Sequence, residues 1–452
     1  MNNLKPQHLI ILSFLFVIFI GSLLLKLPFA TTNKNISYIN ALFTATSATI
    51  VTGLNVLDTG NDFTFFGQLI ILILIQIGGL GFMTILIFLS LLLNQKFTIK
   101  QKLIIQESIT QYQQKNLKQL LKEIIFIVLF FEIIGALILY FRFRNFYHLK
   151  NALWQAIFHS ISAFCNAGFS LFASSLINFS SDFYVIITIA LLIVFGGLGF
   201  IVLYEIKDII FLKKKIRKNI SLFSFHSKII LVTTFALIFS SAILIYFFEN
   251  NNSFLNFPEN KKILISLFHS ITPRTAGFNA IDMQHLSLPT LFITMILMFI
   301  GGSPCSTAGG IKTSSFFILI NYFIILLKGQ NKIMIFKRTI SDELIKRTLA
   351  VFFISLLVII IAILFLFIID AQYEHIKYNQ NNFLNLLFEA ISAFGTVGLS
   401  LGITSKLVVF EKIIIICLML IGRIGPLMIA LSIFTAKENL KYEYAEEKIL
   451  IG

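Results

Sequence analysis

Charged residues are scarce in this chain. They make up 13 % of its 452 residues, whereas hydrophobic residues make up 57 % and the mean hydropathy is +0.90. A soluble globular protein cannot bury so much apolar surface, so this composition excludes that class and predicts an integral membrane protein. Acidic residues are the scarcer sign, with 21 Asp and Glu against 36 Lys and Arg. Membrane topology explains this excess of positive charge better than a nucleic acid partner does.

Cysteines are few and motifs for catalysis are missing. The three cysteines, Cys165, Cys305 and Cys417, fall in apolar or glycine-rich segments, which argues against a disulfide framework. The sequence has no His-Glu-x-x-His run, so no membrane enzyme is predicted, and no arginine-rich span that would indicate a voltage sensor. The first apolar stretch, residues 9–25, lacks a small-residue cleavage site and is interpreted as a true span.

One pattern is present four times. Each copy is an apolar run, then small or hydroxylated residues, then a glycine and a bulky apolar residue. The copies read LFTATSATIVTGL (42–54), IFHSISAFCNAGF (157–169), LFHSITPRTAGF (267–278) and LFEAISAFGTVGL (387–399). Their glycines lie 115, 109 and 121 residues apart, and such a long regular period predicts one structural unit copied four times.

The apolar segments around these glycines predict the architecture. About 20 apolar residues cross the hydrocarbon core, so eight transmembrane helices are expected, near 8–28, 64–93, 120–141, 182–212, 226–248, 288–328, 347–369 and 406–434. Four shorter segments predict re-entrant pore helices, near 38–49, 150–164, 261–272 and 381–393. The fold class is therefore an all-α integral membrane protein with four parallel repeats around a pseudo-fourfold pore. The repeats cover 1–93, 94–212, 213–328 and 329–434, and a tail covers 435–452.

Positive charge predicts the orientation. Of the 36 Lys and Arg, 23 lie in regions on the side of the N-terminus, at 1–8, 94–122, 207–228, 328–347 and 435–452. Because positive residues favour the cytoplasmic side, both termini are predicted to be cytoplasmic and the glycine loops to open outward.

The four glycine loops predict a potassium filter made of backbone carbonyls. A dehydrated potassium ion needs oxygens in place of its water, and glycine lets the backbone turn carbonyls toward one point. The side chains vary among the copies while the glycine stays, and no carboxylate lies in these windows. The predicted filter residues are Val51, Thr52, Gly53, Leu54, Asn166, Ala167, Gly168, Phe169, Thr275, Ala276, Gly277, Phe278, Thr396, Val397, Gly398 and Leu399.

Polar residues also recur at matching positions eight or nine residues before the four glycines. They are Thr44, His159, His269 and Glu389. A metal site is one interpretation of these residues. They lie on different predicted pore helices without a paired ligand motif, so we favour a role in hydrogen bonds between pore helix and scaffold.

Two features predict a gate inside the filter. Residues 301–310 (GGSPCSTAGG) interrupt segment 288–328, and such a loop at membrane depth must line a wet cavity unless it is only a kink. Arg423 lies in the middle of an apolar segment, which costs about 2.5–3.5 kcal/mol. It either faces the ion path near this loop or pairs with a buried acid such as Glu132 or Glu205. Within a gate loop bounded at 301–313, the predicted gate residues are Gly301, Gly302, Ser303, Ser306, Thr307, Gly309, Gly310 and Lys312, together with Arg423; Lys312 alternatively extends to the cytoplasmic interface.

Further glycines recur 24 to 28 residues after each filter glycine, beginning at Gly78, Gly196, Gly301 and Gly422. Close packing of helices through small residues is the alternative explanation for them.

With these residues identified, the chain resembles the ion-conducting subunits of the Ktr/Trk/HKT superfamily of potassium transporters, over essentially its whole length and closest to the KtrB-type branch. The filter loops carry the resemblance, together with Thr272–Phe278, Gly301–Thr313 (GGSPCSTAGGIKT) and Gly422–Pro426 (GRIGP). It implies a potassium-selective subunit of a bacterial uptake system in the inner membrane. Plant relatives that prefer sodium have serine where this chain has Gly53. Cys305 departs from the glycine expected at its position.

The resemblance also implies partners. Such subunits form homodimers in the lipid bilayer, each protomer with its own pore, on a cytoplasmic ring of nucleotide-binding RCK subunits. This chain has no Gly-x-Gly-x-x-Gly after a strand, so nucleotide is expected to act only through that partner, docked on basic loops such as 213–218. Topology alone explains those loops equally well. The transported ion is potassium, with sodium as a candidate activator and no covalent cofactor. A secondary carrier with a mid-membrane solute site is the main alternative.

Overall fold

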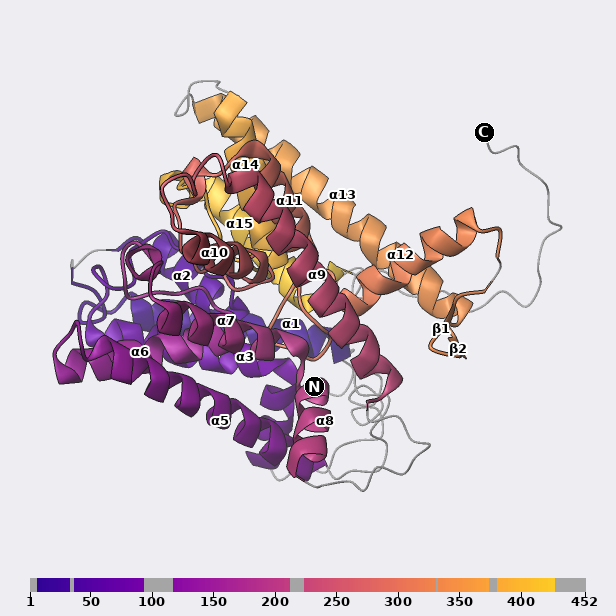
Figure 1. Cartoon of the computed structure of the whole chain (residues 1–452). Helices are drawn as coiled ribbons and strands as arrows, with labels where there is room; N and C mark the ends of the chain where they lie inside the picture. The colour runs from indigo at the N-terminus through magenta and orange to yellow at the C-terminus, as the bar shows by residue number, and fades with distance from the viewer. Residues whose placement is uncertain are drawn as a thin grey trace.

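The computed structural model describes residues 6–32, 36–92, 117–211, 223–330, 332–373 and 380–426. These residues are mostly helical, as Figure 1 shows, and the predicted all-α class is confirmed. The described residues also contain a small antiparallel hairpin of β1 (Met334–Ile335) and β2 (Arg338–Thr339). The hairpin and helix α12 (Thr313–Leu327) lie at one side of the molecule, beside one end of the long helix Asp342–Tyr373 (Figure 1). The tail 435–452, the basic stretch 213–218 and most of 94–122 lie outside the described residues.

Four long helices correspond to the first long segment of each copy. They are α1 (Pro6–Leu25), α5 (Leu117–Phe143), α9 (Phe225–Glu249) and α13 (Asp342–Tyr373). Large apolar side chains point outward from them, including Phe126, which is 58 % exposed, and Phe353, which is 63 % exposed. Such patches are too costly to leave in water, so these surfaces indicate a multi-pass membrane protein.

Length and composition alone identify fewer spans than the sequence predicts. In the described part of the chain, three helices qualify: residues 122–143, 225–249 and 342–372. The pair α7 (Phe183–Leu198) and α8 (Phe200–Phe211) passes the same test only when taken together, and its two helices meet at a bend of 104°, which fits a broken span or a re-entrant loop. Several other apolar helices are shorter, and those of the second long segments are interrupted.

These interruptions occur in the second long segment of every copy. The sequence predicts a break only in 288–328, where α11 (Leu288–Phe299) and α12 indeed flank a loop. Continuous helices over 64–93 and 182–212 are a wrong prediction. Helix α3 (Phe65–Leu92) contains Gly81 at φ 77°, Gly199 between α7 and α8 has φ 91°, and α15 (Val409–Ile424) ends at Gly425 with φ 99°. A positive φ does not fit a right-handed helix, so each glycine turns the chain.

Four short helices precede the glycine loops, close to their predicted positions. They are α2 (Tyr38–Ile50), α6 (Leu149–Phe164), α10 (Glu259–Ile271) and α14 (Gln380–Gly395). Each carries one phenylalanine at the same place in the pattern, Phe43, Phe158, Phe268 or Phe388, and all four rings are fully buried. Short 3-10 helices follow three of the loops: Ile177–Phe179 (η1), Met283–His285 (η2) and Thr404–Lys406 (η3).

The contacts of the short helices place them in a circle. Helix α6 contacts α3, α10 contacts α7, α14 contacts α11, and α2 contacts α15. Each short helix thus packs against the second long segment of the preceding copy, and the last copy returns to the first. This arrangement turns the C-terminal ends of the short helices, and the glycine loops after them, toward one another.

Candidate functional site

The glycine loops, residues 51–54, 166–169, 275–278 and 396–399, share one backbone conformation. In each loop the residue two places before the glycine has a positive φ: 63° at Val51, 58° at Asn166, 74° at Thr275 and 51° at Thr396. The glycines follow with φ of 89°, 69°, 75° and 89°, and the residues between them are not left-handed. A non-glycine residue in this region costs about 1–2 kcal/mol. Four such residues at one register indicate a conformation that the surrounding structure enforces.

A hydroxyl residue near the end of each short helix holds its loop in place. The residue before the glycine donates its N–H to the carbonyl of this hydroxyl residue, over 2.8 Å from Thr52 to Ser47 and 2.9 Å from Val397 to Ser392. The hydroxyls of Ser47 and Ser392 then accept from the glycine N–H, over 3.1 and 3.2 Å. Sequence reasoning missed this role, although the Ser-Ala pair in three of the four copies is a visible signal.

The other two loops use the same hydroxyl differently. Ala167 donates to the carbonyl of Ser162 over 2.8 Å, and Ala276 to that of Thr272 over 2.9 Å. The hydroxyl groups of Ser162 and Thr272 bond the carbonyl after the glycine instead, both over 2.7 Å.

These bonds leave the carbonyls of the loops free. Backbone that alternates between left-handed and other conformations directs successive N–H groups to one side, and here they converge on the short helix. Of the described residues, none donates a hydrogen bond to the carbonyls of residues 51–53, 166–168, 275–277 or 396–398. Buried carbonyls normally find a partner, so these oxygens form an unusual acceptor-rich surface.

The four loops meet in a closed ring. A Cβ placed on Gly53 would lie 2.5 Å from the Ala167 carbonyl oxygen, and one on Gly168 would lie 2.9 Å from that of Ala276. The ring continues from Gly277 to the Val397 oxygen at 2.4 Å, and it closes from Gly398 to the Thr52 oxygen at 2.3 Å. The structure therefore brings together the sixteen residues that the sequence singled out, although they are spread over about 350 positions.

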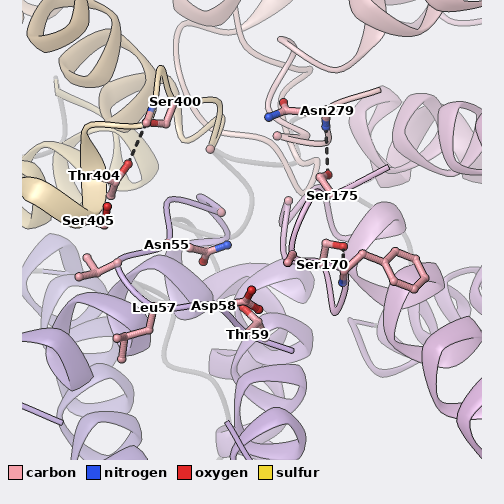
Figure 2. A pocket seen from close by; sticks show the side chains of 18 residues that line it. Asn55, Leu57, Asp58, Thr59, Ser170, Ser175, Asn279, Ser400, Thr404 and Ser405 are labelled. Carbon is pink, nitrogen blue, oxygen red and sulfur yellow. Dashed lines mark hydrogen bonds between the residues drawn. The ribbon is translucent and has the colours of Figure 1, made fainter. Parts of the chain in front are cut away.

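A cavity of about 330 Å³ lies against this ring. All four glycines line it, as do Asn55, Ser170, Asn279 and Ser400, each two residues after a glycine. Figure 2 shows these four side chains around the opening, with Asp58 and Thr59 below them in this view.

The recurring polar residues of the short helices divide into two pairs. His159 Nε2 lies 3.0 Å from the Ser170 hydroxyl, and Glu389 accepts from Ser400 over 2.8 Å and from Thr404 over 2.5 Å. In these two copies the expected hydrogen bonds run to the segment just after the glycine. In the other two, Thr44 Oγ1 and His269 Nε2 have no partner among the described residues. No cluster of three or more His, Cys, Asp and Glu residues suited to a metal ion occurs in the described part of the chain.

The loop between α11 and α12 packs directly against this site. A Cβ on Gly309 of this loop would lie 2.3 Å from the Thr396 hydroxyl. At the end of the neighbouring helix α7, a Cβ on Gly197 would lie 3.4 Å from the Asn166 side chain. The loop is docked on the break between α7 and α8, because Ser303 donates its N–H to the Gly197 carbonyl over 3.0 Å and Phe200 donates to the Cys305 carbonyl over 2.9 Å. It therefore touches the residues at the opposite end of the glycine loops from the cavity.

Internal bonds hold the same loop closed on itself. Ser306 donates to the Ser303 carbonyl over 2.7 Å, and Thr313 donates its N–H to the Gly302 carbonyl over 3.0 Å. Lys312 Nζ donates to the Ala308 carbonyl over 2.7 Å, so this side chain bonds the loop and does not extend to the membrane surface.

Arg423 fastens the loop from outside. Its guanidinium donates to the carbonyl of Thr307 in the loop and to that of Gly78 in α3. Of the described residues, no acid forms an ion pair with Arg423, so the alternative pairing with Glu132 or Glu205 is wrong. Glu132 instead accepts from Gln76 over 3.3 Å.

The further glycines, which recur 24 to 28 residues after the filter glycines, have two roles. A Cβ on Gly78, Gly196 or Gly422 would lie within 2 Å of a carbonyl oxygen near the end of a short helix, on Thr49, Phe164 or Phe394. Their first glycines therefore serve close packing, while the glycines three residues later break the helix. Cys305 has φ 55°, which gives a physical reason for the glycine expected there.

Comparisons with known proteins agree with this geometry. The model of the TrkH family, described as cation transport proteins, matches residues 6–442. The chain is 39 % identical over 451 residues to "Ktr system potassium uptake protein B" of Bacillus subtilis, covering 99 % of this chain and 97 % of that protein. It is 35 % identical to "Potassium/sodium uptake protein NtpJ" of Enterococcus hirae, covering 100 % and 98 %. The crystal structure of the potassium transporter TrkH from Vibrio parahaemolyticus matches with a TM-score of 0.72 at 18 % identity, covering 96 % of this chain and 86 % of that one. This chain belongs to the TrkH family of cation transport proteins.

Proposed function

We propose that this protein is the potassium-conducting subunit of a bacterial potassium uptake system. One observation carries the proposal: four glycine loops meet in a ring, and the buried carbonyls of the first three residues of each loop accept no hydrogen bond from the described residues. Oxygens arranged in this way can replace the hydration shell of a potassium ion. The names of the relatives, potassium uptake proteins of the Ktr system, support the same ion.

The arrangement of the chain in the bilayer is part of the proposal. Eight membrane-crossing segments and four re-entrant helices form four repeats around a pseudo-fourfold axis through the ring. Both termini lie in the cytoplasm, and the cavity lined by Asn55 and Asn279 opens outward in the inner membrane. The negative ends of the four short helices then point at the ion, which adds a further attraction for a cation.

In this filter, formed by residues 51–54, 166–169, 275–278 and 396–399, the free carbonyls of the first three residues of each loop select the ion. The N–H groups are bound to Ser47, Ser162, Thr272 and Ser392, so the loops cannot easily turn their oxygens away. Because the loops are held by these bonds, the ring of carbonyls cannot contract freely around a smaller ion. It therefore stabilises an ion of one size more than a smaller one. The absence of carboxylates in the loops favours a monovalent over a divalent cation.

The gate consists of loop 301–313 together with Arg423. The loop closes the inner end of the filter, because Gly309 lies against Thr396. Arg423 bonds the loop through the Thr307 carbonyl and adds a positive charge beside the path. Opening requires these bonds to break, after which the glycines of the loop allow it to move aside.

Regulation and assembly follow from the family resemblance. The protein forms a homodimer in the lipid bilayer and binds a cytosolic nucleotide-binding RCK subunit. Support for a partner comes from relatives that are named as parts of a Ktr system. Sodium is proposed as an activator, and one relative is named a potassium/sodium uptake protein. Potassium is the transported ion, and no covalent cofactor takes part.

Flux into liposomes tests the proposal. Purified protein should carry potassium and rubidium down their gradients without a stoichiometric co-solute, with sodium excluded. Gly53→Ser is the selectivity test, since its side chain would meet the Ala167 carbonyl oxygen, and it should raise the permeability to sodium relative to potassium. Transport strictly coupled to a second solute would favour the alternative, a secondary carrier, and no potassium movement would refute both.

A further inference from the structure

The cavity outside the ring has an uneven lining. Most of its wall is made of glycine, hydroxyl and amide residues, and Asp58 is the one charged residue among the described residues that line it. Asp58 comes from the segment after the first glycine loop, and Figure 2 shows its carboxylate between Asn55 and Thr59 at the edge of the opening.

The carboxylate of Asp58 is fixed in place by its neighbours. Oδ1 accepts the N–H of Gly60 over 2.8 Å and that of Asn61 over 3.1 Å, and Oδ2 accepts from the Asn61 amide over 2.9 Å. A carboxylate offers about four acceptor positions, so about one remains, on Oδ2. No lysine or arginine among the described residues pairs with Asp58, so its charge is not neutralised by the protein.

Two further acceptors of this lining lack partners. The side-chain oxygens of Asn55 and Asn279 are buried without a hydrogen bond among the described residues. They belong to the first and third copies, which lie across the ring from each other. In the second and fourth copies the residues at the same position, Ser170 and Ser400, are bound to His159 and Glu389. Asn55 and Asn279 line the cavity, but these two oxygens have almost no solvent-accessible surface, so the charge of Asp58 is what acts on an ion in this space.

The volume of the cavity decides the form of the ion that fits it. Its 330 Å³ corresponds to about ten water molecules at about 30 Å³ each. An ion in such a space keeps most of its water, and the protein acts on it mainly through charge and through bonds to that water.

We propose that this cavity is a second cation site, which holds a hydrated monovalent cation before it enters the filter. Asp58 supplies the attraction, and the hydroxyl and amide groups of the lining bind the water of the ion. The site concentrates cations at the mouth and does not distinguish potassium from sodium, because a hydrated ion presents water and charge alone. The inference depends on the proposed function, since it needs the ring to be a conducting path.

The test uses the full-length protein in liposomes, with rubidium uptake measured against external rubidium concentration. At low ionic strength Asp58→Asn should raise the half-saturating concentration about three- to tenfold, because a focused carboxylate raises the local cation concentration. The maximal rate and the rubidium/sodium ratio should stay as in the wild type. The effect should fade in high salt, where the Debye length falls from about 30 Å at 0.01 M to about 3 Å at 1 M.

Two variants separate this site from general surface charge and from misfolding. Asp282→Asn removes the same charge from a side chain that is 51 % exposed and does not line the cavity, and it should leave the half-saturating concentration unchanged. Asp58→Glu keeps the charge and should retain most of the wild-type affinity. Equal shifts in the two asparagine variants, no shift in Asp58→Asn, or loss of flux in both Asp58 variants would overturn the proposal. A wild-type protein that carries no rubidium would instead refute the proposed function.

Discussion

A methyl group added to Gly398 should damage conduction far more than it damages the fold. The Cβ of an alanine there would lie 2.3 Å from the Thr52 carbonyl oxygen and 2.9 Å from the backbone of Gly53. Ordinary contact begins near 3.4 Å, so the two loops must separate by about 1 Å, and no flexible side chain can yield in their place. The carbonyl that moves is one that we propose as a ligand of the ion.

Gly329→Ala is a matched control for this prediction. Gly329 also has a positive φ, 64° against 89° for Gly398, but a Cβ there meets nothing within 4 Å. Both variants carry the strain of a left-handed alanine, about 1–2 kcal/mol. Only Gly398→Ala adds the collision within the ring.

Rubidium uptake into liposomes, at matched protein incorporation, measures the difference. We expect Gly398→Ala to lose at least about tenfold in flux, which corresponds to about 1.4 kcal/mol in the barrier, and to admit more sodium relative to rubidium. Gly329→Ala should stay within about twofold of the wild type in flux. Comparable flux in the two variants, with selectivity intact in both, would mean that contact between the loops does not shape the ion path.

Three further variants test other parts of the site. Arg423→Gln removes a charge and at least one of the two bonds to Thr307 and Gly78, so potassium flux should rise several-fold; unchanged flux would contradict the proposed gate. The Glu389 carboxylate accepts from the Ser400 and Thr404 hydroxyls, and Glu389→Gln leaves one carbonyl oxygen to accept from both. Rubidium/sodium selectivity should therefore fall while the protein stays folded. Intact selectivity would argue against a positioning role for Glu389. Cys305→Gly removes the strain of φ 55° but adds the chain entropy of glycine to the unfolded state, and these two terms of about 1 kcal/mol nearly cancel. The thermal midpoint of unfolding should therefore shift by less than about 3 °C. Cys305→Val should lower this midpoint clearly.

The sequence was informative wherever a feature is written into neighbouring residues. The four short helices lie close to their predicted ranges, because a local apolar pattern ending at a glycine specifies both the helix and its end. The break at 301–310 was visible for the same reason, since glycine and proline interrupt a helix by themselves.

The wrong predictions have a common cause. Gly81 and Gly199 lie in otherwise good apolar helices, where an isolated glycine is tolerated, and nothing local says that φ will become positive. Likewise Val51 and Thr275 are residues that disfavour a left-handed conformation, and they adopt it because the rest of each loop is bound to its helix.

By itself the sequence determined the membrane class, the four copies and the glycines that matter, because hydropathy and glycine content are properties of the chain alone. Only the tertiary structure decided which distant residues contact one another. Arg423 could have paired with an acid, but it bonds Gly78, 345 positions away, and Thr307, 116 positions away. Such partners depend on how separate copies pack around one axis, and no local pattern of residues records that packing.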